Sequence, residues 1–206
     1  MESSFFIVEG RPILQDETPR DHAVRDWQDA ADFELIELAQ ANEADAFGEL
    51  YYRHAKRVFR FLYAHINDQL DAEELTSEVF IRAWRTVSNH RDQGIPFIVY
   101  LLRIARNVLV DYYRLSARSG EHMSIEDRMI PDNHPDPDES VATQLERQEL
   151  RKTLERLQED HRTVLILRFL SGLTAEETGQ VMGRTPGAVR LLQQRALSAL
   201  RNLLEL

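Results

Sequence analysis

The residues best suited to bind another molecule lie on one face of a predicted helix near the C-terminus. Apolar side chains recur at helical spacing along residues 186–204, so the polar side chains between them face away from the protein. This outward face carries Gly187, Arg190 and Gln194, with Arg184 and Arg195 beside it. Arginine and glutamine form the hydrogen-bond pairs that identify guanine and adenine in duplex DNA. The pattern indicates a helix that reads DNA, although a plain helical hairpin with a solvated basic face would show the same residues.

A second basic helix is predicted from Pro96 to about Ser116. Its polar side chains include Arg103, Arg106, Asn107 and Arg114, and three tyrosines lie among them: Tyr100, Tyr112 and Tyr113. Arginines that bind phosphates, next to rings that stack on exposed bases, suit single-stranded or melted nucleic acid. In the alternative interpretation the tyrosines belong to the core, and Arg103 or Arg106 pairs with acids of the preceding helix.

An acidic stripe is predicted on the helix that precedes this basic one. Asp71, Glu74 and Glu78 are spaced by three and four residues, which places them on one face opposite the apolar side chains. Such a stripe is often only solvated. It can also steer a basic protein partner to this face.

The sequence offers no constellation for catalysis or metal binding. It contains no cysteine, which excludes disulfides, thiolate metal sites and thiol catalysis. Its seven histidines are scattered, and the Glu-x-x-His pattern of carboxylate-metal bundles does not occur. No apolar run is long enough for a membrane span, and the start of the sequence does not resemble a signal peptide. We therefore predict a cytoplasmic protein that is not an enzyme and needs no cofactor.

Charge is unevenly distributed along the chain. The formal net charge is −10, yet residues 96–119 carry four basic and one acidic group, and residues 143–206 carry ten and eight. Between these two positive segments, residues 120–142 carry one basic and seven acidic groups. The pattern predicts two local basic surfaces on an otherwise acidic chain.

The helices that must position these residues can be placed by periodicity, and strand signals are missing, so the chain is predicted to be all-α. We expect helices at about 33–41, 45–66, 71–87, 96–116, 143–157, 161–170, 174–182 and 186–204. Asp71 and Glu74 have the spacing of a capping box, as do Thr174 and Glu177. Thr185 before Pro186 predicts an N-cap, and the preceding turn through Gly183 completes a helix-turn-helix.

Four segments follow from this pattern. Residues 1–32 are predicted to be an irregular extension, or one that a partner orders. Residues 33–116 form a first helical domain, and residues 143–206 form a second. Residues 117–142, with three prolines among their acids, form a flexible acidic linker.

Three motifs resemble the extracytoplasmic-function (group 4) sigma factors of the sigma-70 family. Residues 71–84, DAEELTSEVFIRAW, are similar to the polymerase-binding helix of that family, and residues 101–107, LLRIARN, to its promoter-melting helix. Residues 162–177 and 187–190, the latter GAVR, are similar to its fourth domain. The sequence departs from the usual pattern at Tyr100, where tryptophan is common, and at Thr178 and Gly179, where isoleucine and alanine are usual.

The resemblance implies a role for each matched position. Asp71, Glu74 and Glu78 would bind the clamp helices of the polymerase β′ subunit. The loop at residues 88–95 would capture a flipped base of the −10 element, and the melted strand would lie on Arg103, Arg106, Asn107 and Arg114. The −35 element would be read as duplex by Arg184, Thr185, Gly187, Arg190, Gln194 and Arg195.

Partners follow from the same resemblance, and alternatives remain. The chain would bind the RNA polymerase core, including the β flap, and promoter DNA, and an anti-sigma factor would inhibit it, in some relatives at the membrane. A helix-turn-helix regulator that works without polymerase would explain the C-terminal half alone. A protein-only adaptor would require both basic helices to be inert toward DNA.

Overall fold

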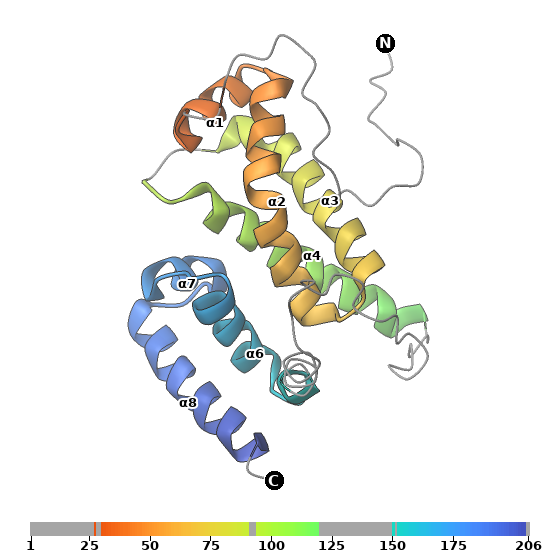
Figure 1. Ribbon diagram of the computed structural model, residues 1–206, viewed down its shortest axis with the longest axis vertical. Coiled ribbons are helices and arrows are strands. Elements are labelled where there is room, and N and C mark those ends of the chain that lie inside the picture. The colour runs from red at the N-terminus through yellow and green to blue at the C-terminus, as the bar shows by residue number, and fades with distance from the viewer. Residues whose placement is uncertain (1–26, 28–29, 91–93, 120–149, 151, 205–206) are drawn as a thin grey trace, which may run out of the picture.

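The computed structural model describes residues 27, 30–90, 94–119, 150 and 152–204, and every regular element in these ranges is a helix. This confirms the predicted all-α fold. In Figure 1 the helices of the N-terminal half occupy the upper part, and those of the C-terminal half the lower part. The predicted acidic linker lies outside the described residues apart from 117–119, and the predicted extension does so apart from residues 27 and 30–32.

Four α-helices build the N-terminal domain. They are α1 (Asp32–Gln40), α2 (Ala44–Ile66), α3 (Gln69–Thr86) and α4 (Phe97–Ser119), with a short 3-10 turn η1 at Val87–Asn89. Helix α2 packs against the other three (Figure 1). The largest fully buried side chains of this core are Leu35, Leu50, Phe61, Leu62, Val79, Phe97, Leu101 and Leu102. Each such side chain contributes about 1.5–3 kcal/mol through its removal from water.

The start of α3 differs from the prediction. Asp71 was expected to cap this helix, but α3 begins one turn earlier and Asp68 is its N-cap. The Asp68 carboxylate accepts a hydrogen bond from the Asp71 backbone N–H at 3.0 Å. The Asp71 side chain is therefore free to point at another element.

The C-terminal domain is a helix-turn-helix on a supporting helix. Helix α6 (Glu159–Leu165) continues as a π-helical turn, η2 (Ile166–Leu170), and is followed by α7 (Ala175–Met182) and α8 (Pro186–Leu204). The predicted capping box is confirmed, because the Thr174 hydroxyl accepts from the Glu177 N–H while the Glu177 carboxylate accepts from the Thr174 N–H. Gly183 makes the turn with a φ of 66°, a left-handed conformation that glycine adopts without strain.

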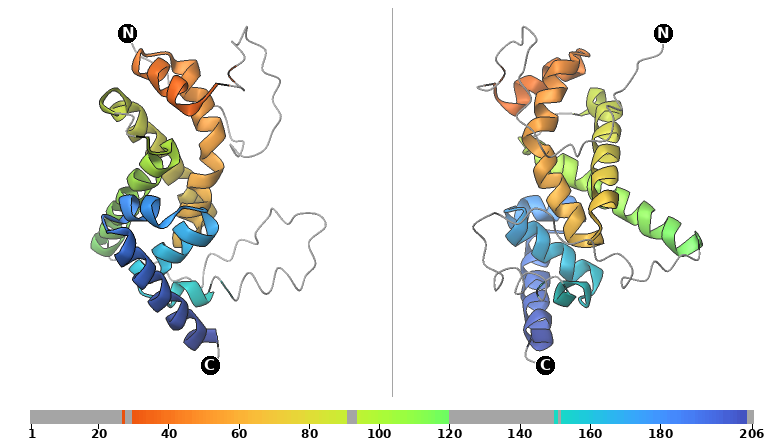
Figure 2. Two further views of the ribbon diagram at one scale, coloured as in Figure 1. Left: turned by 90° about the vertical axis from the view of Figure 1, so that its left-hand side faces the viewer. Right: turned by 45° about the vertical axis from the view of Figure 1, so that its right-hand side comes forward.

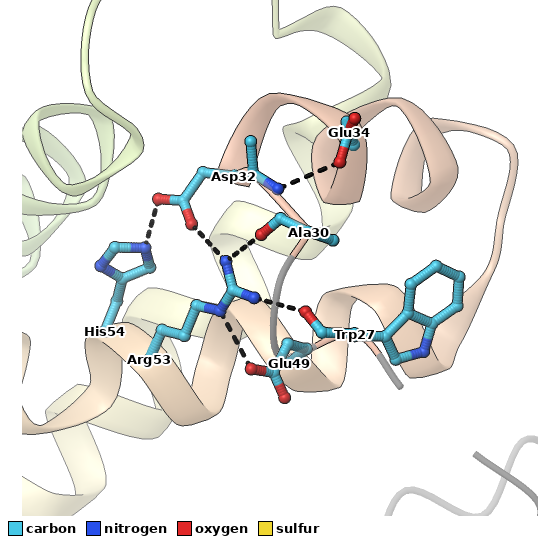
Figure 3. A network of polar contacts seen from close by, with 8 residues as sticks. Trp27, Ala30, Asp32, Glu34, Glu49, Arg53 and His54 are labelled. Atoms are coloured by element: carbon cyan, nitrogen blue, oxygen red, sulfur yellow. Dashed lines mark hydrogen bonds and ion pairs between the residues drawn. The ribbon is translucent and has the colours of Figure 1, made fainter. Parts of the chain in front are cut away.

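One arginine ties the chain before α1 to the middle of α2. The Arg53 guanidinium donates to the backbone oxygens of Trp27 at 2.6 Å and Ala30 at 2.7 Å. It also pairs with Asp32 at 3.1 Å and with Glu49 at 2.9 Å (Figure 3). Trp27, Ala30 and Asp32 of the predicted extension are thus held on the folded domain.

The same network reaches a buried histidine. His54 Nε2 lies 2.7 Å from the second oxygen of Asp32 (Figure 3). Burial lowers the pKa of His54, and Asp32 partly opposes that effect. Asp32 therefore joins α1 to two successive residues of α2.

The two domains pack against each other, with α4 next to α7 and α2 next to η2 (Figure 2). Arg57 of α2 donates to the backbone oxygen of Ser171 at 2.7 Å. His65 of α2 lies 3.0 Å from the Thr163 hydroxyl, and Arg162 donates to the His65 backbone oxygen at 3.1 Å. These polar contacts join the second half of α2 to α6 and to the residue that follows η2.

His65 makes the stability of the protein depend on pH. Its side chain is buried, and its Nδ1–H donates to the Phe61 carbonyl oxygen at 2.8 Å, so Nε2 accepts from Thr163 in the neutral form. Burial lowers the pKa of His65 from 6.5 to about 4, and the cations of Arg162 and Arg106 also lower it.

We expect the free energy of unfolding to rise from pH 4 to pH 6.5, because the unfolded chain binds more protons than the folded one in this range. At roughly 1.4 kcal/mol per pKa unit, the contribution of His65 is at most about 3 kcal/mol, complete above pH 6.5 and lost toward pH 4. Urea unfolding of the wild type and His65→Gln at several pH values measures it. The difference between the two proteins should vary across this range, and parallel pH profiles would contradict the assignment.

Candidate nucleic-acid and protein interfaces

The start of α8 presents the predicted duplex-reading side chains to solvent. Thr185 caps the helix, since its hydroxyl accepts from the Ala188 N–H at 3.3 Å, and Pro186 is the first helical residue. Arg190 is well exposed and pairs with Glu176 of α7 at 3.0 Å. The other predicted positions on this face, Gly187, Gln194 and Arg195, are exposed as well. The predicted buried stripe faces inward, because Val189 and Ala196 are buried and Leu192, Ala199, Leu200 and Leu203 are partly buried.

An arginine that the sequence analysis did not single out supports this helix from behind. The Arg168 guanidinium, in the π-helical turn, donates to the Gln193 side-chain oxygen at 2.9 Å and to the Leu173 backbone oxygen. Arg168 thereby fixes α8 relative to the turn that precedes α7. Its spacing alone gave no signal, because an arginine at the end of an apolar run also fits a solvated position.

Helix α4 exposes most of its predicted polar side chains. Arg103, Asn107 and Arg114 are exposed, whereas Arg106 is half-buried. Arg106 lies 3.9 Å from Asp160 of α6, so its ion pair is with the other domain and not with an acid of α3. The row of polar groups expected along α4 is therefore present, with one arginine covered by the C-terminal domain.

The hydroxyl groups of the three tyrosines form hydrogen bonds within the protein. Tyr100 lies 2.6 Å from the Thr86 hydroxyl, and the Tyr113 hydroxyl donates to the backbone oxygen of His65 at 2.9 Å. The Tyr112 hydroxyl donates to the Asp71 carboxylate at 2.6 Å. Burial is the main cause that raises the pKa of Tyr112, and the Asp71 carboxylate raises it further. These bonds join α4 to α2 and α3. The alternative interpretation placed all three tyrosines in the core, but Tyr113 is 36% exposed, and only Tyr100 packs against the buried core.

The loop between α3 and α4 is braced from α1. The Gln40 side-chain amide donates to the backbone oxygens of Val87 at 3.1 Å and His90 at 2.6 Å. The His90 ring lies 4.6 Å from the Tyr100 ring, measured between centroids. The predicted base-capturing loop therefore begins on a fixed support, while residues 91–93 lie outside the described part.

The acidic stripe of α3 lies beside α4, and two of its three carboxylates form hydrogen bonds or ion pairs within the protein. Asp71 is occupied by Tyr112, and Glu78 pairs with Arg82 at 2.7 Å. Arg82 continues to Asp111 of α4 at 2.9 Å, which gives a second polar bridge between the two helices. Glu74 is exposed, and the structure shows no ion pair for it among the described residues. The three predicted acids thus share one helix face but differ in their freedom to bind a partner.

Two further features are absent from the described ranges. No group of three or more metal-ligating side chains occurs there. No helix in the same ranges is both long and apolar enough to cross a membrane.

Both domains match models of known protein families. Residues 50–119 match the model of Sigma-70 region 2, and residues 153–202 match that of Sigma-70, region 4. The chain is 38% identical over 186 residues to the ECF RNA polymerase sigma factor BldN of Streptomyces coelicolor, covering 87% of this chain and 68% of BldN. It is 34% identical over 160 residues to the RNA polymerase sigma factor CarQ of Myxococcus xanthus, covering 78% of this chain and 90% of CarQ.

Solved structures show the same fold. The structure of CnrH in complex with the cytosolic domain of CnrY matches with a TM-score of 0.62 and 25% identity over 84% of this chain and 97% of CnrH. The sigma factor RpoE of Bartonella quintana, solved with the anti-sigma factor NepR, matches in fold with a TM-score of 0.60 and 23% identity over 78% of this chain and 97% of RpoE. With regions 2 and 4 in the order that the sequence motifs predict, the chain belongs to the extracytoplasmic-function sigma factors of the sigma-70 family, which direct RNA polymerase to promoters to initiate transcription.

Proposed function

We propose that the two DNA-facing helices and the acidic stripe divide the work of initiation among them. The start of α8 reads the −35 element as duplex through Arg184, Thr185, Gly187, Arg190, Gln194 and Arg195. Helix α4 holds the melted −10 strand through Arg103, Arg106, Asn107 and Arg114. Asp71, Glu74 and Glu78 of α3 bind the β′ clamp helices of the polymerase, and the C-terminal domain also binds the β flap.

The observation that carries this proposal is the exposed polar face of α8 directly after the tight turn at Gly183. In a helix-turn-helix the first residues of the second helix enter the major groove, and this is where the exposed arginine and glutamine side chains lie. The chain would catalyse no reaction by itself, because the chemistry of transcription belongs to the polymerase. It would act in the cytoplasm, where the polymerase and the promoter are found.

An anti-sigma factor is the proposed inhibitor. The similar sigma factor RpoE was solved with the anti-sigma factor NepR, and CnrH with the cytosolic domain of CnrY. A related inhibitor would keep this chain from the polymerase until a signal releases it. Co-purification of the chain from its own cell, followed by identification of a bound protein that blocks transcription, tests this part.

Run-off transcription with purified bacterial core polymerase tests the proposed function directly. The chain plus core should give a transcript from a cognate promoter, and neither should do so alone. Absence of any binding to core would overturn the proposal. Tight binding of the chain to a promoter duplex without core, together with no transcript, would favour a polymerase-independent regulator.

Replacing Arg190 by glutamate should lower −35-dependent initiation by about 10- to 100-fold, because a lost bidentate base contact is worth about 1–3 kcal/mol. Core binding should stay intact, since α3 is untouched. Run-off transcription and a core-binding titration measure the two effects. Arg201→Glu is the matched control: it reverses an exposed charge in the last turn of α8, far along the helix from the reading face. Equal losses for both variants would show that the effect is nonspecific electrostatics.

A further inference from the structure

One large apolar side chain lies on the polar face of α8 that is proposed to read DNA. Leu191, in the second turn of the helix, is 48% exposed. Along the sequence it is flanked by the proposed −35 contacts Gly187, Arg190, Gln194 and Arg195, all of which are exposed. Unlike the arginines and the glutamine, its side chain has no hydrogen-bond donor or acceptor. The −35 contacts proposed above leave Leu191 without a role.

Helix geometry places Leu191 within this face and away from the core. An α-helix turns by about 100° per residue, so Leu191 lies about 40° around the axis from Gly187 and about 60° from Gln194. The buried side chains Val189 and Ala196 lie on the opposite side, about 160° and 140° away from it. Leu191 therefore points toward whatever molecule the polar face binds.

Gly187 leaves Leu191 uncovered on the side nearest the start of the helix. Side chains on a helix lean toward its N-terminus, so Leu191 leans toward the turn that contains Gly187. Glycine has no side chain, and a Cβ atom built at this position would meet nothing within 4 Å. In a helix-turn-helix, the residues at this end of the second helix contact base edges in the major groove. Leu191 is thus directed to the end of α8 where base contacts form.

Thymine is the base whose major-groove edge suits a leucine. Every base pair presents hydrogen-bond donors or acceptors in the major groove, and thymine alone adds an apolar group, its 5-methyl. A leucine pressed against the edge of guanine, adenine or cytosine would leave polar groups without a partner, which lowers affinity. Contact between a leucine and the thymine methyl instead removes apolar surface of both groups from water.

We propose that Leu191 selects a thymine in the −35 element by packing against its 5-methyl group. This inference rests on the proposed function, which places the start of α8 in the major groove of that element. Arg190 and Gln194 form hydrogen bonds to neighbouring base pairs, and Leu191 adds one apolar contact between them. The promoter preference of this chain therefore includes a thymine that hydrogen bonding alone does not specify.

Selection from a duplex library with randomised −35 positions identifies that thymine. Holoenzyme, assembled from the chain and core polymerase, should enrich a thymine at one position for which Leu191→Ala holoenzyme shows no preference. Alanine is a good helix former, so α8 should stay folded, and circular dichroism checks this. Leu197→Ala is the matched control, because Leu197 is another exposed leucine of α8, at 41%, but lies beyond the reading residues. It should keep the preference of the wild type.

Replacement of the selected thymine by uracil then tests the methyl group by itself, because uracil lacks only that group. In a competition assay the uracil promoter should bind wild-type holoenzyme about fourfold more weakly, which corresponds to about 0.8 kcal/mol, the value of one buried methylene. The same promoter should bind Leu191→Ala holoenzyme as well as the thymine promoter does. Methylation of a cytosine placed at that position should tighten binding of the wild type and leave Leu191→Ala unchanged.

Three results would overturn this inference. Uracil might weaken wild type and Leu191→Ala equally, or no thymine of the selected element might respond to loss of its methyl group; Leu191 would then read no methyl. Loss of core binding in Leu191→Ala would assign Leu191 to a polymerase contact instead. Failure of the holoenzyme to enrich any −35 sequence would count against the proposed function itself, whereas an enriched sequence without a methyl response counts against Leu191 alone.

Discussion

Replacing Glu74 by lysine should weaken binding to core polymerase by about 10- to 100-fold, while the fold of the chain stays unchanged. Glu74 is exposed in the middle of the acidic stripe and makes no ion pair among the described residues, so its reversal breaks no internal contact. A lysine there would face the basic partner that the stripe is proposed to bind. Like charges brought together at an interface cost several kcal/mol when they cannot move apart, and less at a solvated rim.

Binding of labelled chain to core polymerase at several salt concentrations measures this effect. Much of the loss of affinity should appear as a lower association rate, because exposed charges steer the encounter of the two proteins. The difference in affinity between variant and wild type should shrink as the salt concentration rises. Glu37→Lys is the control, since Glu37 is an exposed acid on α1, away from the stripe. Unchanged affinity for Glu74→Lys would place the polymerase contact on another face.

Asp71 and Glu78 are less suitable for that test, for a reason that only the structure reveals. Asp71 accepts the Tyr112 hydroxyl, and Glu78 belongs to the chain of ion pairs through Arg82 to Asp111. Reversing either charge would disturb the packing of α3 on α4 as well as the stripe. Lost polymerase binding in such a variant would therefore have two explanations.

Features that depend on neighbours in sequence were predictable. The capping box of Thr174 and Glu177 needs only a spacing of three residues, and the structure has it. The buried stripe of α8 follows from a period of 3.6 residues, which any amphipathic helix shows. The N-cap of α3 was missed because Asp68 and Asp71 are both suitable caps one turn apart. Local preference does not choose between two such positions.

Features that join distant segments were not predictable. The Arg106 side chain finds Asp160, which is 54 residues away and in the other domain. The hydroxyl of Tyr112 finds Asp71, 41 residues earlier. Periodicity assigns each of these side chains to a polar face but does not say which other face will cover it. This is why candidates for DNA and polymerase binding could be listed from the sequence, while the contacts between the domains could not.

The helix-turn-helix should be displaced when Gly179 is replaced by a side chain larger than the alanine that is usual at this position in the family. A Cβ atom built at this position would lie 2.5 Å from the backbone oxygen of Arg184, closer than real contacts allow. The Gly179 backbone oxygen also accepts the Arg184 N–H at 2.9 Å, so the two segments cannot separate without losing that bond. The turn that leads into α8 therefore lies directly on α7 at this glycine.

Gly179→Val should lower the free energy of unfolding of the C-terminal domain by about 1–3 kcal/mol, the usual cost of overpacking. It should also abolish −35-dependent initiation, because displacement of Arg184 moves the start of the reading helix. Binding to core through α3 should persist in a pull-down. Gly48→Val is the matched control, since Gly48 is also helical but has open space around it, and valine there should be nearly neutral. Full −35-dependent activity of Gly179→Val would mean that the turn can move away from α7 without displacing the recognition helix. The position of α8 would then have to depend mainly on the bond from Arg168 to Gln193.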